Sequence, residues 1–353
     1  MMARTVSIAG RKIGEGHPVF IIAELSANHR QSYTNAVKLI KAAKSSGADA
    51  VKLQTYTPDT ITIDVDNRFF RVDHPEWGGQ TLYQLYKKAY TPWKWFGKLK
   101  KAADDAGIIF FSTAFDKTSV DFLEELGVPA HKLSSFELVD LPLIEYTAKT
   151  KKPLILSTGM ATENEIKEAV DTAKKAGAKD IILLKCVSSY PADPAQMNLK
   201  MIPHLEKTFC LPVGLSDHGL DMAVPSAAVA LGAKVIERHF TLSRNTKSPD
   251  SFFSTEPDEL KELITNIRSV EKALGKVRYS LSREEKKSRL HRRSLFAVKD
   301  IKKGEIFTGE NIRSIRPAYG ISPKYEKKMI GRRSSKNIKK GTPISFGQIG
   351  KSR

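Results

Sequence analysis

Cysteine is scarce in this chain, because only Cys186 and Cys210 occur among its 353 residues. Two cysteines cannot form the disulfide framework of a small secreted protein, so we expect both to be buried, reduced thiols. Long apolar runs are also absent, and the longest, around residues 222–233, is too short to cross a bilayer. The first residues lack the apolar stretch of a signal peptide, so we expect a cytoplasmic protein with no membrane partner.

Acidic residues are outnumbered, since 58 lysines and arginines face 39 aspartates and glutamates, a net charge of +19. Residues 281–353 hold 21 of the basic and 6 of the acidic residues, which leaves a net charge of only +4 for the first 280. The stretch SLSREEKKSRLHRRS (280–294) is charged and has almost no apolar period. This asymmetry predicts a first domain over residues 1–280, a linker over 281–291 and a second domain over 292–353.

A glycine-rich phosphate turn after the first strand is missing, which argues against a dinucleotide-binding open sheet. What the first domain contains instead is eight short apolar runs that alternate with segments of helical period. The runs occupy residues 19–25, 50–56, 108–115, 130–135, 153–159, 180–189, 211–218 and 234–240. Strands that are apolar on both faces and joined by helices form a parallel sheet. Eight such units predict an α/β fold, a closed (β/α)8 TIM barrel, with a doubly wound open sheet as the alternative.

Two segments depart from the barrel pattern. In the second domain, DIKKGEIFTGENI (300–312) recurs as NIKKGTPISFGQI (337–349), which predicts a small β-rich module of two related halves. In the first domain, residues 58–92 are far too many for an ordinary connection between a strand and a helix. At the C-terminal end of a barrel, we expect this long segment to form a wall of the substrate pocket.

Polar side chains gather at the C-terminal ends of the predicted strands, where a barrel keeps its active site. They are Glu24, Lys52, Gln54, Thr113, Lys132, Ser135, Ser157, Lys185, Ser188, Tyr190, Ser216, His218 and His239. Ammonium and hydroxyl groups that converge on one mouth suit a phosphate, which offers several acceptor oxygens and a charge of about −2. A turn or a solvent contact would explain any one of them, but their recurrence at equivalent strand ends favours an anion site.

The motifs VGLSDHG (213–219) and VIERHF (235–240) end consecutive predicted strands with a histidine each. In a closed barrel, His218 and His239 would face one ion from neighbouring strands. Imidazole is a ligand for Mn, Fe, Co, Ni, Cu and Zn, and two histidines leave positions open for water or substrate oxygens. The alternative is that each histidine only hydrogen-bonds a neighbour. The pair favours a catalytic divalent metal.

Seven motifs together resemble those of the sialic acid synthase family. They are IIAELSANH (21–29), VKLQTY (51–56), FFSTAF (110–115), LSTGM (156–160), GLSDH (214–218), VIERHF (235–240) and RPAYG (316–320). The resemblance covers almost the whole chain and implies a barrel followed by an antifreeze-like (SAF) domain. Within the family, TYTPDTIT (55–62), LYQLYKKAYTPW (82–93) and SPDSFFS (248–254) are most similar to pseudaminic acid synthases.

The resemblance implies a metal-dependent condensation of phosphoenolpyruvate with an amino-sugar aldehyde, here 2,4-diacetamido-2,4,6-trideoxy-altrose, and water. By motif, the residues implied to hold phosphoenolpyruvate are Lys52, Thr113, Lys132, Ser135, Ser157, Ser188 and Ser216. Those implied to meet the sugar are Gln54, Tyr190, Asp250 and Arg316, with Arg316 reaching the active site of the other subunit of a domain-swapped homodimer. His218 and His239 are implied to hold Mn, Co or Mg. Glu24 is implied to position or deprotonate water, or only to bind the sugar.

Several alternatives stay open at this point. Ala114 and Ser188 depart from the pattern of N-acetylneuraminate synthases, and N-acetylneuraminate or legionaminate synthesis remains the nearest alternative. One pocket hydroxyl can decide between such sugars. From another class, the basic second domain suggests a nucleic-acid-binding protein. It has no recognised binding motif and few aromatic residues, so we expect only non-specific, salt-sensitive attraction to nucleic acid.

Overall fold

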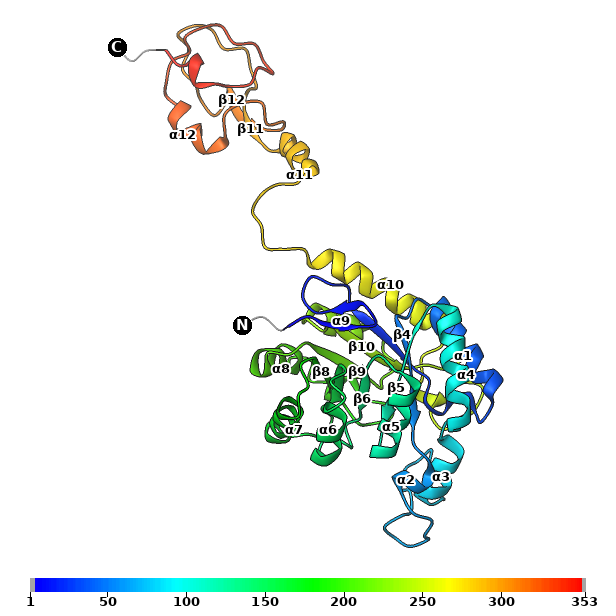
Figure 1. Ribbon diagram of the computed structural model, residues 1–353. Helices are drawn as coiled ribbons and strands as arrows, with labels where there is room; N and C mark the ends of the chain where they lie inside the picture. Colours follow the sequence, from blue (N-terminus) through cyan, green and yellow to red (C-terminus); the bar gives the residue numbers. More distant parts are fainter. Residues whose placement is uncertain (1–3, 351–353) are drawn as a thin grey trace. The chain divides into compact units, whose positions relative to one another are not determined.

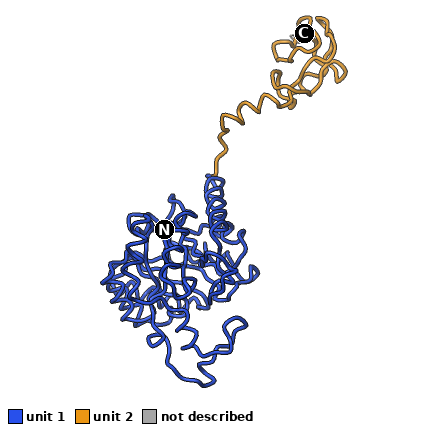
Figure 2. The backbone as a smooth tube through the Cα atoms, turned by 90° about the vertical axis from the view of Figure 1, so that its right-hand side faces the viewer, with its two compact units in different colours: residues 1–275 blue, residues 276–353 orange. Residues whose placement is uncertain are grey.

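The computed structural model describes residues 4–350, and the chain divides into two compact units, residues 1–275 and 276–353 (Figure 2). The outer bounds predicted for the two domains, residues 1 and 353, lie outside the described residues. One buried apolar cluster runs from Val6 to Ile267, and a separate one runs from Leu295 to Ile344. Each unit therefore has a hydrophobic core built from its own segment.

Eight parallel strands close into a barrel in the first unit, which confirms the predicted fold (Figure 1). The strands are β3 (Phe20–Glu24), β4 (Ala50–Thr55), β5 (Ile109–Ala114), β6 (His131–Leu133), β7 (Leu154–Ser157), β8 (Ile181–Cys186), β9 (Val213–Asp217) and β10 (Val235–His239). They pair in chain order, and β10 closes the ring by pairing with β3. An antiparallel hairpin of β1 (Val6–Ile8) and β2 (Arg11–Ile13) precedes them and buries Val6, Ile8 and Ile13 in the same core.

Helices follow the strands and surround the barrel (Figure 1). They are α1 (Tyr33–Ser45), α4 (Phe96–Ala106), α5 (Lys117–Leu126), α6 (Leu141–Ala148), α7 (Glu163–Lys175), α8 (Met201–Phe209), α9 (Ala223–Ala230) and α10 (Pro257–Leu274). In α1 the inward stripe is Ala36, Leu39, Ile40 and Ala43, at the spacing of one helix face. Among residues 4–350, no helix is both long enough and apolar enough to span a membrane.

Local sequence sets where these helices begin and end. Thr162 starts α7 with a capping box, in which its hydroxyl and the carboxylate of Glu165 satisfy each other's backbone N–H groups. Gly127 ends α5 in the left-handed conformation, with φ of +72°. Cys210 takes the same role after α8, with φ of +55°, and is exposed there. The prediction that both cysteines are buried is therefore wrong for Cys210, because the cap of a surface helix faces water, while Cys186 is buried on β8.

The long segment after β4 forms a lobe that extends from the barrel (Figure 1). It contains α2 (Pro58–Ile61) and α3 (Leu82–Ala89). Each helix starts with a threonine capping box, at Thr57 and Thr81 respectively. Because this segment begins where β4 ends, the lobe starts at the C-terminal ends of the strands, where the predicted site residues lie.

The second unit contains α11 (Arg283–Ser288), α12 (Glu326–Met329) and an antiparallel pair of β11 (Ser294–Ala297) and β12 (Ile312–Ile315). Its repeat is visible in the backbone. Ile301 and Ile338, at equivalent positions of the two halves, donate hydrogen bonds of 2.8 Å to each other's carbonyl oxygens. Phe307 and Ile344, also equivalent, are both fully buried. The two halves thus share one small core.

Candidate functional site

A pocket of about 530 Å³ opens at the C-terminal end of the barrel. Most of the side chains predicted from the sequence line it: Lys52, Gln54, Thr113, Lys132, Ser135, Ser157, Tyr190, Ser216, His218, His239 and Asp250. Strand register explains why they converge. Side chains alternate between the two faces of a strand, and the register pairs Gln54 with Thr113, Thr113 with Lys132, and Ser216 with Glu237. Paired residues face the same side, which here is the barrel interior.

Two buried lysines form the floor of the pocket. Lys52 Nζ donates to Thr113 Oγ1 at 2.8 Å, and Lys132 Nζ donates to Ser157 Oγ at 2.7 Å. Only 3% of Lys52 and 2% of Lys132 is exposed. Each ammonium group is therefore paired with a hydroxyl, and together they form a compact group of hydrogen-bond donors.

Two glutamates set the charge state of this floor. Lys52 forms an ion pair with Glu24, and its Nζ lies 3.9 Å from Glu237 Oε2. Burial lowers the pKa of Lys52, but Glu237 and Glu24 outweigh it, so the pKa is raised overall. Burial raises the pKa of Glu24 to about 7 against the pull of Lys52, and burial lowers the pKa of Lys132. The positive charge of Lys132 is thus balanced less by nearby carboxylates than that of Lys52.

The two histidines lie side by side over this floor, with ring centroids 5.3 Å apart. Nδ1 of His218 donates a hydrogen bond of 2.9 Å to the carbonyl oxygen of Val187, so in the neutral ring Nε2 carries the lone pair. His239 Nδ1 is buried and has no hydrogen-bond partner among the described residues. Burial and the neighbouring His218 lower the pKa of His239 well below its usual value. The His239 imidazole is therefore neutral and available as a ligand.

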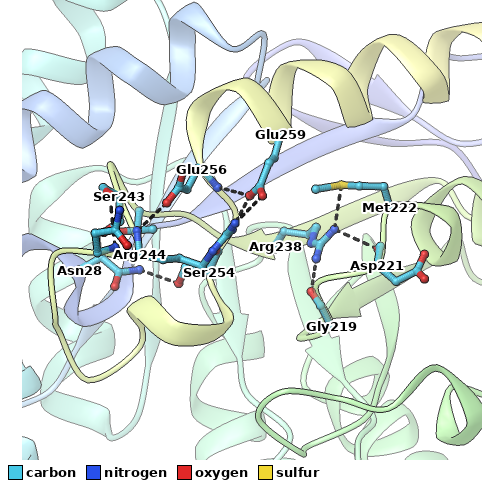
Figure 3. A network of polar contacts seen from close by, with 12 residues as sticks. Asn28, Gly219, Asp221, Met222, Arg238, Ser243, Arg244, Ser254, Glu256 and Glu259 are labelled. Atoms are coloured by element: carbon cyan, nitrogen blue, oxygen red, sulfur yellow. Dashed lines mark hydrogen bonds and ion pairs between the residues drawn. The ribbon is translucent and has the colours of Figure 1, made fainter.

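Behind the histidines, on the outer face of the same strands, a buried ion pair connects β9 to β10. Asp217 precedes His218 and Arg238 precedes His239, and Arg238 Nε lies 3.5 Å from Asp217 Oδ2. Figure 3 shows the Arg238 guanidinium reaching the loop after β9, where it donates to the carbonyl oxygens of Gly219 and of Asp221, the latter at 3.3 Å. These contacts join the end of β10 to the loop that follows His218.

One side of the pocket is built from residues far apart in the sequence. Asp250 accepts hydrogen bonds from the Ser26 hydroxyl and from the backbone N–H of Ala27, the latter at 3.2 Å. Burial raises the pKa of Asp250. The Tyr190 ring packs at 4.5 Å from the His218 ring, measured between centroids. These residues place a carboxyl and a phenol group beside the histidines.

Some predicted residues are not among those that line the pocket in the described part of the chain. Glu24 lies beneath it, where it binds Lys52 and the backbone N–H of Ser26 at 3.0 Å. Ser188 Oγ is 3.9 Å from Cys186 Sγ at the pocket's edge. Arg316 is exposed on the second unit. Lys185 alternates with the inward Cys186 and lies on the helix side of β8, in a cavity next to Met201 and Leu205 of α8.

Sequence reasoning missed several lining residues. Glu237 lies two residues before His239 on β10, so strand alternation alone places both side chains on one face. Cys186 follows from the same rule, as the inward neighbour of Ser216 on β9. Burial raises the pKa of the Cys186 thiol, but His218 outweighs it and brings the pKa to about 7. Ser26, Tyr56, Trp77 and Glu137 also line the pocket, and these come from loops whose course the sequence does not indicate.

Comparison with known proteins accounts for this fold. Residues 39–279 match the NeuB family, and residues 292–349 match the SAF domain. A pseudaminic acid synthase from Campylobacter jejuni subsp. jejuni is 45% identical over 331 residues, which cover 94% of this chain and 96% of that protein. An N,N'-diacetyllegionaminic acid synthase from the same organism is 42% identical, over 90% of this chain and 96% of that protein.

A solved structure gives the same result. The crystal structure of an N-acetylneuraminic acid synthetase from Leptospira borgpetersenii is 33% identical and superposes with a TM-score of 0.73. The match covers 81% of this chain and 95% of that one. The resemblance found in the seven sequence motifs is thereby confirmed: this chain belongs to the NeuB family.

Proposed function

We propose that this protein is a pseudaminic acid synthase, which condenses phosphoenolpyruvate with 2,4-diacetamido-2,4,6-trideoxy-altrose and water to give pseudaminic acid and phosphate. The observation that carries the proposal is the barrel floor, where two buried lysines, several hydroxyls and two histidines meet in one pocket. The pseudaminic acid synthase at 45% identity over 94% of the chain supports the choice of sugar. Legionaminate synthesis is the second candidate, supported by the relative at 42% identity.

Phosphoenolpyruvate carries a phosphate and a carboxylate, and the floor offers donors for both. Lys52 and Lys132 supply charge-assisted hydrogen bonds, which are roughly twice as strong as neutral ones. Gly159 brings further donors close, since its backbone N–H lies 3.0 Å from Ser135 Oγ. A side chain at position 159 would meet the Ser188 and Ser135 hydroxyls, so the glycine permits this approach. We propose that Thr113, Ser135, Ser157, Ser188 and Ser216 complete the anion site.

A divalent metal fits the two histidines. His218 presents a free Nε2, and His239 has a buried ring nitrogen without a partner. Within residues 4–350, no set of three or more His, Cys, Asp or Glu side chains is arranged to hold a metal. Two imidazoles would leave positions for water and substrate oxygens, and Mn, Co or Mg bound there would polarise the sugar aldehyde as a Lewis acid.

The chain's own residues would bind and orient the two substrates and would move protons. Holding the enol carbon C3 of phosphoenolpyruvate against the aldehyde carbon of the sugar makes the new C–C bond an intramolecular step. The aldehyde oxygen takes a proton, and water adds to C2 and loses one proton. The bond from C2 to the phosphate oxygen then breaks, phosphate leaves, and the added oxygen loses its second proton to become the carbonyl oxygen of C2. Glu24 is sequestered with Lys52 beneath the pocket, which supports a role in holding Lys52 and its charge over a role as a sugar ligand. Tyr190, Asp250 and Gln54 remain to meet the sugar.

The second unit carries Arg316, which bears on how two subunits assemble. We propose, from the resemblance, a homodimer in which Arg316 of one subunit enters the barrel mouth of the other. Arg316 is exposed on a unit with its own core, which is compatible with such a reach. An arginine there could bind an N-acyl oxygen and help to exclude water. A cytoplasmic location stays a prediction, to be checked by cell fractionation.

Phosphate release tests the proposed function. The purified protein, with Mn²⁺ and phosphoenolpyruvate, is given three sugars in turn: the trideoxy-altrose, the corresponding legionaminate precursor and N-acetylmannosamine. We expect the trideoxy-altrose to give the highest kcat/KM, with the nine-carbon product identified by mass. Higher turnover with another sugar would reassign the substrate. Absence of phosphate release with all three, together with co-purifying absorbance at 260 nm, would favour the nucleic-acid alternative.

A further inference from the structure

The pocket has two chemically different halves. Its floor is charged, while its outer wall is apolar and comes from the segment after β4. Helix α3 contributes Leu82, Leu85, Tyr86 and Ala89 to this wall. Their spacing of three and four residues puts all four on one face of the helix. The opposite face carries exposed Gln84, Lys87 and Lys88.

This apolar face does not serve the hydrophobic core. In the described part of the chain, no residue of α3 is fully buried, and none belongs to the barrel's core cluster. Tyr86 packs edge-on against Tyr56, with ring centroids 5.4 Å apart, and α3 otherwise packs on α2 and the turn Ser26–His29. An amphipathic helix whose apolar face meets a pocket instead of a core has that face available to a ligand.

Trp77 continues the wall on the side of the histidines. Its Nε1 donates to the carbonyl oxygen of Pro249 at 2.6 Å, which connects the lobe to the segment that carries Asp250. Its ring lies 5.6 Å from the ring of Tyr190, which in turn packs on His218. The apolar wall is therefore continuous with the catalytic end of the same pocket.

We infer that the apolar wall, made of Trp77, Leu82, Leu85 and Tyr86, selects amino sugars whose end remote from the aldehyde carries a terminal methyl group in place of a hydroxyl. The inference rests on the proposed function. The aldehyde must lie at the charged floor to react, so the other end of the sugar lies against the wall. A hydroxyl placed against Leu82 or Leu85 loses its water and gains no partner from these side chains, which costs on the order of 1–3 kcal/mol.

An apolar wall can favour one sugar over another only by a limited factor in kcat/KM. An apolar pocket rejects a ligand with one added hydroxyl by about a hundredfold at most. We therefore expect the wild-type protein to prefer a 2,4-diacetamido-2,4,6-trideoxyhexose over N-acetylmannosamine, which keeps its C4 and C6 hydroxyls, by roughly ten- to a hundredfold in kcat/KM.

The test is the ratio of kcat/KM for these two sugars, measured by phosphate release in the full-length protein. In Leu85→Asn the ratio should fall about tenfold, because the amide can pair with a hydroxyl and no longer favours a methyl group. Leu85→Met keeps the wall apolar and should retain most of the ratio. Lys87→Asn, on the exposed face of the same helix, should leave it unchanged. Leu82→Gln provides a second polar variant if Leu85→Asn does not fold.

The outcomes separate this inference from the function on which it rests. Equal losses on both sugars in Leu85→Asn and Leu82→Gln would give the wall a structural role only and overturn the inference. The inference would also be overturned if the kcat/KM ratio of the two sugars changed when residues 276–353 were removed but not in the two polar variants. The wall would then serve contact with the second unit. A wild-type protein that releases no phosphate with any amino sugar would overturn the proposed function itself.

Discussion

Lys52 and Lys132 look alike in the sequence, but only Lys52 has a carboxylate partner in contact. We expect Lys132→Met and Lys52→Met each to raise the KM for phosphoenolpyruvate at least tenfold, since a lost charge-assisted bond costs roughly 2 kcal/mol. Their stabilities should differ. Lys132→Met replaces a buried charge with an apolar chain, whereas Lys52→Met leaves the buried Glu24 without its ion-pair partner, at a cost of about 3–5 kcal/mol. Initial-rate kinetics and thermal unfolding measure both; an unchanged KM in both variants would contradict the anion site.

The histidine pair makes a second prediction at the residue scale. Chelation should abolish turnover and Mn²⁺, Co²⁺ or Mg²⁺ should restore it, because two imidazoles leave the metal open to exchange. His218→Ala and His239→Ala should lose both Mn²⁺ binding, measured by titration calorimetry, and turnover. His204→Ala, on the exposed side of α8, is the matched control. If both site variants bind the metal and turn over normally, the metal lies elsewhere.

At the scale of elements, β9 and β10 are joined at their ends by the buried pair of Asp217 and Arg238. Arg238→Met should lower the free energy of unfolding by about 3–5 kcal/mol, because it leaves the Asp217 carboxylate buried without a counter-charge. Arg244→Met breaks the nearby contact with Glu259 (2.5 Å; Figure 3), where both side chains are about a third exposed. That loss should be about 1 kcal/mol or less.

Urea unfolding of the two variants provides the comparison. The double variant Asp217→Asn with Arg238→Met should regain part of the lost stability, since the uncompensated charge is gone. Equal losses in the two single arginine variants would show that the Asp217 pair does not join the strand ends in the way described.

At the scale of the whole molecule, the two units have separate cores. A chain ending at residue 275 should therefore fold and bind Mn²⁺ and phosphoenolpyruvate, while most condensation activity is lost with Arg316. Circular dichroism measures folding, calorimetry measures binding of Mn²⁺ and phosphoenolpyruvate, and phosphate release measures condensation activity. Full activity in the truncated chain would remove the second unit from the reaction.

A sharper experiment mixes two inactive full-length variants, Arg316→Ala and His239→Ala. If each site takes its arginine from the partner, mixed dimers regain one intact site of two. Random pairing in equal amounts should restore roughly a quarter of wild-type activity. Subunit exchange without recovery of activity would show that Arg316 does not act across the dimer.

The sequence by itself determined the elements and the order of the barrel. Eight runs with apolar residues on both faces can be buried only between helices, and the polar residue at each strand end falls at one mouth because the strands are parallel. That is why Lys52, Lys132, His218 and His239 could be named without coordinates. The same alternation already contained Glu237, two positions before His239.

Only the tertiary structure decided the contacts that depend on loops and on distance across the barrel. Strand alternation does not reveal that Glu24 turns to Lys52 beneath the pocket, because this contact depends on the register between β3 and β4. Trp77 reaches Pro249 across 172 positions of the chain, a contact without local signal. The apolar face of α3 could equally have met a core, and its position over the pocket is set by the course of the lobe. Local periodicity fixes which faces are apolar, whereas the packing of distant segments fixes what those faces meet.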